Sequence, residues 1–168
     1  QGFIPIGQAG RFPFIGQIDG QNHAISGLHI ESQDGGGLFW QLQYPAKVSN
    51  LQINGALVQA SGYNIGLLAG YVFGESTEKP VIIDNVLVEG KIITVHDATN
   101  APQNVGGLAG YARRAVATNT RAEIDIEADH QNGHKSSRVG GLFGLVDYIT
   151  IKNSSAVGQI SGWKNIGG

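Results

Sequence analysis

Apolar and polar residues alternate along four stretches of the chain, and each stretch contains an asparagine. The asparagines are Asn50, Asn85, Asn119 and Asn153, which lie 35, 34 and 34 residues apart. Alternation with a period of two predicts a strand that buries one face, whereas the spacing of three and four that a helix needs is nowhere sustained. The inward positions, at one, three, five and seven residues after each asparagine, are Leu51, Ile53, Gly55, Leu57; Val86, Val88, Gly90, Ile92; Thr120, Ala122, Ile124, Ile126; and Ser154, Ala156, Gly158, Ile160.

A second block, in which glycines precede a leucine, alternates with the asparagine stretches. It occurs at residues 36–39, 66–70, 106–110 and 140–144, and it begins again at residue 166. Glycine takes a positive φ and permits close approach between backbones, so we place this block at a tight corner. The leucines of the block should stack in the core, and they are Leu38, Leu68, Leu108 and Leu142.

Self-similarity with a period near 34 residues predicts a solenoid in which each repeat is one coil. We expect an all-β, parallel β-solenoid of about four coils of roughly 34 residues, each with three short strands, and a right-handed β-helix in particular. Residues 25–30 mirror the asparagine stretch, with Gly27 in place of the asparagine, and form an N-terminal partial coil. Residues 1–168 should therefore be one solenoid segment. Because the chain starts without Met and stops within a repeat, we expect a fragment of a longer chain.

The parity of burial changes at each asparagine, since the pattern places both the residue two before it and the residue directly after it on the inward face. A strand cannot do this without a bend or bulge. We therefore place Asn50, Asn85, Asn119 and Asn153 at a corner with their amides pointing inward, stacked as a hydrogen-bonded ladder. The alternative is that these asparagines occupy exposed turns.

Composition excludes several classes of function. The 26 glycines follow no Gly-X-Y period, which excludes collagen, and the formal charge of −2 provides no field that would attract nucleic acid. There is no cysteine, and no apolar run approaches the ~20 residues that span a bilayer. Glycine-rich phosphate loops are absent as well. We expect no nucleic-acid partner, no membrane insertion and no cofactor.

If the coils are a scaffold, ligand contacts should lie on insertions, which residues 74–80, 96–103 and 129–137 provide. The last two follow the asparagine stretch in successive coils and should emerge on the same side. The alternative is that they are solvated insertions. A metal site is disfavoured because Asn132 and Gly133 mark a turn between the two histidines. The candidate contact residues are His96, Asp97, Asn100, Asp129, His130, Asn132 and His134.

The repeated blocks resemble the GLUG-repeat family. Residues 105–110 and 139–144 are similar to its glycine-leucine core, residues 151–162 to its second half, and residues 3–7 and 14–28 to the segment that often precedes such repeats. Trp40, Leu67 and the glycine-free stretch after Asn119 depart from the pattern. The resemblance implies β-solenoid segments of large secreted adhesins, haemagglutinin-like exoproteins and the neighbours of bacterial IgA-cleaving metallopeptidases, and it implies no active site.

We therefore expect a non-catalytic, structural or adhesive segment of an extracellular bacterial surface or secreted protein. Its loops would contact a host glycan or matrix protein, and its coils would associate with one another or with flanking coils. An accessory domain of a secreted peptidase would look the same. A further alternative is a carbohydrate-active β-helix, either a polysaccharide lyase or hydrolase or a tailspike-like binder. Glu89, Glu123 and Asp125 would then lie on the outward face of neighbouring coils and supply an acid pair, although Arg121 and Lys91 balance their charge.

Overall fold

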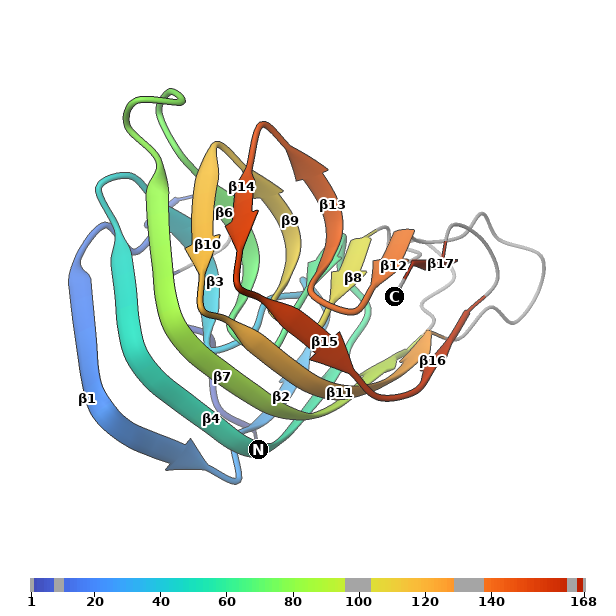
Figure 1. Cartoon of the computed structure of the whole chain (residues 1–168). Helices are drawn as coiled ribbons and strands as arrows, with labels where there is room; N and C mark the ends of the chain where they lie inside the picture. The colour runs from blue at the N-terminus through green and yellow to red at the C-terminus, as the bar shows by residue number, and fades with distance from the viewer. Residues whose placement is uncertain (1, 8–10, 96–103, 129–137, 163–165, 168) are drawn as a thin grey trace.

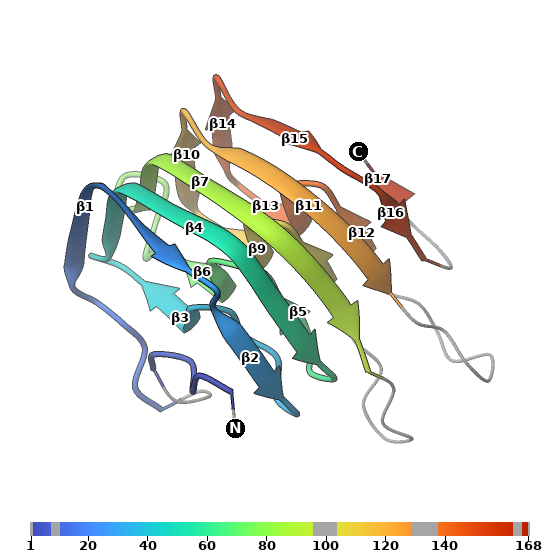
Figure 2. The same ribbon diagram turned by 90° about the horizontal axis from the view of Figure 1, so that it is seen from below.

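The chain folds as a parallel β-solenoid of about four coils (Figure 1). A computed structural model describes residues 2–7, 11–95, 104–128, 138–162 and 166–167. Every strand pair in these ranges is parallel, and the strands of successive coils lie side by side along one axis (Figure 2). The all-β fold, the parallel pairing and the number of coils agree with the sequence prediction.

Three sheets form the walls of the solenoid. The widest, here the long sheet, contains β1 (Gln17–Ser26), β2 (His29–Ser32), β4 (Lys47–Ala60), β7 (Val81–Thr94), β10 (Ala115–Thr118), β11 (Arg121–Ala128), β14 (Thr150–Lys152), β15 (Ser155–Val157) and β16 (Ile160–Ser161). The tyrosine sheet contains β3 (Phe39–Gln43), β6 (Ala69–Phe73), β9 (Ala109–Arg113) and β13 (Phe143–Asp147). The glycine sheet contains β5 (Asn64–Ile65), β8 (Asn104–Gly106), β12 (Arg138–Gly140) and β17 (Ile166–Gly167).

The core runs through the middle of all coils as columns of like side chains. Register places Val48, Ile83 and Ala117 in one column, and all three are fully buried. The leucine column includes Leu68 and Leu108, each with no exposed surface. Burying such a side chain contributes roughly 1.5–3 kcal/mol, so the stacked columns account for most of the stability of the solenoid.

A bulge in β4 changes which side chains face the core. Gly55 has φ +61°, and the pairing of β4 with β7 shifts between Ile53 and Ala56. Because one extra residue enters the strand there, Ala56 and Val58 are buried whereas Leu57 turns outward, which corrects the prediction for Gly55 and Leu57. This extra residue also accounts for the spacing of 35 rather than 34 in that repeat.

The N-terminal partial coil exists, but its alignment with the other coils differs from the prediction. Ser26 pairs with Asn54, and Gly27 N donates to Asn54 O, so Gly27 lies beside Gly55 and forms the same bulge. The residue that takes the place of the repeated asparagine is Asn22, which has φ +63°. Gly27 therefore does not substitute for an asparagine.

Most glycines of the Gly-Gly-Leu block are required for close approach and not for a positive φ, and Gly36, with φ +108°, is the exception. A Cβ on Gly107 would lie 2.3 Å from Gly141 O, and a Cβ on Gly106 would lie 2.3 Å from Ala109 O, but neither residue has a positive φ. Successive coils thus approach one another through bare backbone at this corner.

Among the described residues, no helix is long and apolar enough to cross a membrane.

Candidate functional site

The repeated asparagines form a column at the bend of the long sheet. Asn85 Nδ2 donates to Asn50 Oδ1 at 2.8 Å, and Asn153 Nδ2 donates to Asn119 Oδ1 at 3.4 Å. Between these two pairs the column is interrupted, because Asn119 Nδ2 donates to Asp84 Oδ1 at 2.9 Å and not to Asn85. Asp84 therefore takes the place of an amide acceptor in the middle of the column.

The amides of this column point outward and not into the core. Asn85, Asn119 and Asn153 are exposed, Asn50 is half-buried, and all four have φ between +50° and +54°. A single residue in this left-handed conformation bends the strand, so the residues on both sides of it face the core while its own side chain faces solvent. The inward orientation predicted from the sequence is wrong for this reason. The exposed bend that we gave as the alternative is what the structure shows.

The register position directly before this column contains two carboxylates whose pKa values are lowered. Asp19 accepts a hydrogen bond from Asn50 Nδ2 at 3.0 Å and one from Gln21 N, and these bonds hold its pKa below the ordinary value. Hydrogen bonds from Thr118 Oγ1 and then Asn119 lower the pKa of Asp84. Each bond stabilises the charged form, so these acids remain acceptors in the ladder.

The predicted contact loops lie outside the described residues, and these loops contain His96, Asp97, Asn100, Asp129, His130, Asn132 and His134. The strand ends that flank them are described. Ala128 pairs with Thr94, and Arg138 pairs with Asn104, so both loops leave and rejoin the solenoid on neighbouring coils (Figure 2).

A second polar column, which the sequence analysis missed, lies where these loops rejoin the glycine sheet. Asn104 Nδ2 donates to Asn64 Oδ1 at 2.7 Å, and Arg138 Nη1 donates to Asn104 Oδ1 at 3.3 Å. Asn104 is buried, at 7% exposed, whereas Arg138 is exposed. The signal in the sequence is a polar residue directly before the Ile-Gly or Val-Gly pairs at residues 65–66, 105–106 and 139–140. The column provides a fixed cation beside the candidate loops.

The outer face of the tyrosine sheet carries aromatic and cationic side chains, a second feature that the sequence analysis missed. The rings of Tyr71 and Tyr111 are 5.0 Å apart, and the Arg113 guanidinium lies 5.7 Å from the ring of Phe73. Arg113 also forms an ion pair with Asp147 at 3.0 Å. The pKa of Tyr71 is raised, mainly because its phenol is partly buried and secondly because Tyr111 lies beside it. Cross-strand stacking and cation–π contact stabilise neighbouring coils and leave a half-buried aromatic surface.

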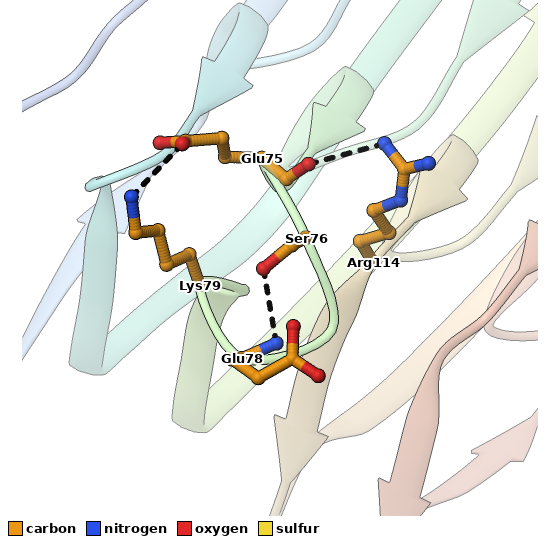
Figure 3. A network of polar contacts seen from close by, with 5 residues as sticks. All are labelled: Glu75, Ser76, Glu78, Lys79 and Arg114. Atoms are coloured by element: carbon orange, nitrogen blue, oxygen red, sulfur yellow. Dashed lines mark hydrogen bonds and ion pairs between the residues drawn. The ribbon is translucent and has the colours of Figure 1, made fainter.

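Residues 74–80 form the loop between β6 and β7 (Figure 3). Lys79 Nζ pairs with Glu75 Oε1 at 2.9 Å, and Arg114 Nη1 donates to Glu75 O at 3.2 Å. The backbone N–H of Glu78 donates to Ser76 Oγ at 3.2 Å. Because its polar groups bond to one another and to the next coil, the loop is part of the scaffold.

The outward acids of the long sheet lie close to one another and to basic side chains. Glu123 lies directly beside Glu89 in register, but Arg121 Nε is bound to Glu123 Oε1 at 2.6 Å. Lys91 Nζ pairs with Glu127 Oε1 at 2.6 Å. No group of three or more metal-ligating side chains occurs within the described ranges.

Comparisons with known proteins relate the chain to parts of much longer ones. It is 28% identical over 176 residues to an immunoglobulin A1 protease of Streptococcus pneumoniae serotype 4, a match that covers 91% of this chain and 8% of the protease. An immunoglobulin A1 protease of Streptococcus sanguinis is 28% identical over 151 residues, which cover 88% of this chain and 8% of that protein. Halomucin of Haloquadratum walsbyi is 32% identical over 151 residues, which cover 84% of this chain and 2% of halomucin.

The chain thus spans less than a tenth of the length of these relatives. No family model and no solved structure matches the chain.

Proposed function

We propose that this chain is a non-catalytic accessory segment, of the GLUG-repeat type, in an extracellular bacterial surface or secreted protein. The observation that carries the proposal is that one solenoid segment of this kind is similar to parts of two differently named proteins, a protease and halomucin. If similar segments occur in proteins with different names, the segment supplies a property that is useful to each of those proteins. A stiff, extended scaffold is such a property, because each coil packs only against its neighbours.

The proposal that the protein lies outside the cell is supported by the substrate for which one group of relatives is named. Immunoglobulin A1 is a secreted protein, so an enzyme named for it meets its substrate outside the host cell.

Two experiments separate a scaffold from an enzyme. The isolated chain should leave immunoglobulin A1 intact, and it should also leave a panel of polysaccharides uncleaved. Deleting the segment from a parent protease should raise KM with little change in kcat, because an accessory segment supplies binding and no reacting group. Cleavage by the isolated chain that is lost in Glu123→Gln would favour the carbohydrate-active alternative.

We further propose that the contact surface for a host glycan or matrix protein comprises the two loops at residues 96–103 and 129–137 together with Arg138. The support is that both loops are attached to neighbouring coils, next to an exposed guanidinium held by Asn104. Arrays of host glycans and matrix proteins would identify the ligand. Replacing His130 and His134 by alanine should then weaken binding at least fivefold, whereas Glu78→Ala in the scaffold loop should not. Equal binding by both variants would remove these loops from the proposal.

A further inference from the structure

The outer face of the tyrosine sheet carries a group of aromatic and cationic side chains on its two central strands. Tyr71 and Tyr111 lie side by side in one outward column, and Phe73 and Arg113 lie side by side in the next. All four are half-buried, and their strands, β6 and β9, have β3 on one side and β13 on the other. This group, here the aromatic surface, therefore belongs to the body of the solenoid.

The tyrosine rings leave part of their faces uncovered. The ring centroids of Tyr71 and Tyr111 are 5.0 Å apart, and their planes make an angle of 33°. Rings in full overlap would lie about 3.5–4.0 Å apart, so each ring is displaced sideways and covers its neighbour only in part. The two rings form a stepped apolar surface, against which the C–H groups of a sugar ring can pack.

Two guanidinium groups lie beside these rings, at 5.7 Å (Arg113) and 6.0 Å (Arg114) from the ring of Phe73. Arg113 is paired with Asp147 through Nε, at 3.0 Å. Arg114 Nη1 donates to the backbone carbonyl of Glu75, and its other terminal nitrogen points away from that loop (Figure 3). Within the described ranges Arg114 forms no ion pair, so its charge is not neutralised by a carboxylate.

The aromatic surface has a surplus of one positive charge. Burial raises the pKa of Tyr71, Arg113 and Arg114 oppose this increase, and Asp147 adds to it, so this phenol lies in the field of two cations and one anion. In the loop at residues 74–80, the lysine pairs with the first glutamate at 2.9 Å and adds no net charge. The second glutamate of the loop lies away from Arg114 (Figure 3).

We propose that the aromatic surface, together with Arg114, binds a sugar that carries a carboxylate. The sugar ring packs against Tyr71 and Tyr111, and the carboxylate accepts hydrogen bonds from Arg114, a geometry that guanidinium groups favour. Cation–π contact with Phe73 holds both guanidinium groups beside the tyrosines. One surplus charge matches one carboxylate, whereas a polyanion such as nucleic acid requires many cations.

This site lies apart from the candidate contact loops. Arg114 lies at the corner between the tyrosine sheet and the long sheet, between β9 and β10, whereas the loops at residues 96–103 and 129–137 join the long sheet to the glycine sheet. The proposal shares with the proposed function only the class of ligand, a glycan, and it uses no residue of those loops. The two can therefore fail separately.

Nuclear magnetic resonance titration of the isotope-labelled chain with three sugars tests the role of charge. 3′-Sialyllactose and digalacturonic acid carry carboxylates, and lactose is 3′-sialyllactose without its acidic sugar. Each acidic sugar should shift the backbone amides of β6 and β9 at concentrations up to about 10 mM, since a small open site binds weakly. Lactose should bind at least fivefold more weakly, and added salt should weaken only the acidic sugars. The acidic sugar that binds more tightly identifies the source of the carboxylate.

Two substitutions locate the site. Arg114→Gln should weaken binding of the acidic sugars at least fivefold and leave lactose unchanged, because it removes the charge and leaves the rings in place. Arg121→Gln, on the long sheet, is the matched control and should bind like the wild type. Tyr111→Leu should weaken binding of all three sugars, since it retains apolar packing and removes a ring. The dispersion of the amide spectrum shows whether each variant is folded.

Equal affinity for lactose and the acidic sugars would overturn the proposal, as would the absence of shifts with all three sugars. Binding that survives Arg114→Gln but is lost when His130 and His134 are replaced by alanine would place the glycan on the loops. That result would overturn this proposal and support the proposed function.

Discussion

Leu108→Ala tests whether the core is a stack in which each coil is packed on both sides. Leu108 is fully buried, and its backbone N–H donates to Leu142 O in the next coil. Replacing it by alanine removes three carbons, which corresponds to roughly 2.4 kcal/mol of transfer free energy at 0.8 kcal/mol per carbon. The cavity left between two coils adds to this loss, so we expect a decrease of about 3–4 kcal/mol in the free energy of unfolding.

Leu142→Ala provides the matched control, because it removes the same atoms from the same column. Leu142 lines a hollow beside β13, β14 and β15 and is half-buried among the described residues, so this substitution should cost about half as much. Urea unfolding followed by far-ultraviolet circular dichroism measures both free energies, at concentrations where the chain is monomeric. Equal costs for the two substitutions, or a cost below about 1 kcal/mol for Leu108→Ala, would refute the reasoning.

Three further predictions concern backbone contact, acid stability and tyrosine titration. Gly107→Ala should lower the free energy of unfolding by about 3 kcal/mol, because the new Cβ would lie 2.3 Å from Gly141 O. In the control, Gly167→Ala should change this free energy by less than about 0.5 kcal/mol, because no atom lies within 4 Å of the added Cβ. Hydrogen bonds lower the pKa of Asp84 in the folded protein. The stability that the charged carboxylate provides is therefore complete above the ordinary pKa near 3.8 and is lost as the pH falls through the lower folded value. Below about pH 4, the free energy of unfolding should fall more steeply with pH for the wild type than for Asp84→Asn. Burial raises the pKa of Tyr71 from its ordinary value of 10.0, so Tyr71→Phe should remove a phenol that ionises above that value in an ultraviolet titration. A titration unchanged by that substitution would contradict the assignment.

The coil period was predictable from the sequence because the interval at which the residue pattern repeats is also the length of one coil. The same apolar pattern recurs at the same interval, and parallel stacking converts this interval directly into columns in space. The leucine column was predictable for the same reason. The positions of the two bulges were not, because Gly55 and Gly27 look like ordinary strand glycines until the register around them is known.

The orientation of the asparagines shows where reasoning from alternation failed. A change of parity at Asn85 is compatible with an inward corner or with a residue in the left-handed conformation, and both give apolar neighbours on each side. Asparagine adopts a positive φ more readily than most residues, a preference that alternation alone does not weigh. The structure selects this second solution, with φ +52° at Asn85.

The polar surfaces were harder to predict than the core because they depend on pairs of residues in different coils. Arg138 is held by a hydrogen bond to Asn104, which lies 34 residues away in the chain. Asp84 accepts the hydrogen bond of Asn119 in place of an asparagine amide, although Asp84 does not belong to the repeated motif. Tyr71 and Tyr111 follow the Ala-Gly pair in two successive coils, so their stacking could have been found by aligning the blocks on the glycines.

The outward asparagines have a consequence for how the solenoid keeps its register. The inward columns are aliphatic almost throughout, so a slip of two residues between coils would still place apolar on apolar and would cost little in burial. Such a slip would set the left-handed bend at Asn85 beside an extended part of the neighbouring strand, and the backbone bonds on both sides of the bend would be lost. The exposed amide bonds are individually worth only about 0.5–1.5 kcal/mol. The bend therefore acts mainly by excluding wrong registers. The glycine corner, where an added Cβ on Gly66, Gly106 or Gly107 would lie below 3 Å from backbone atoms, excludes them a second time on another wall of the same coil.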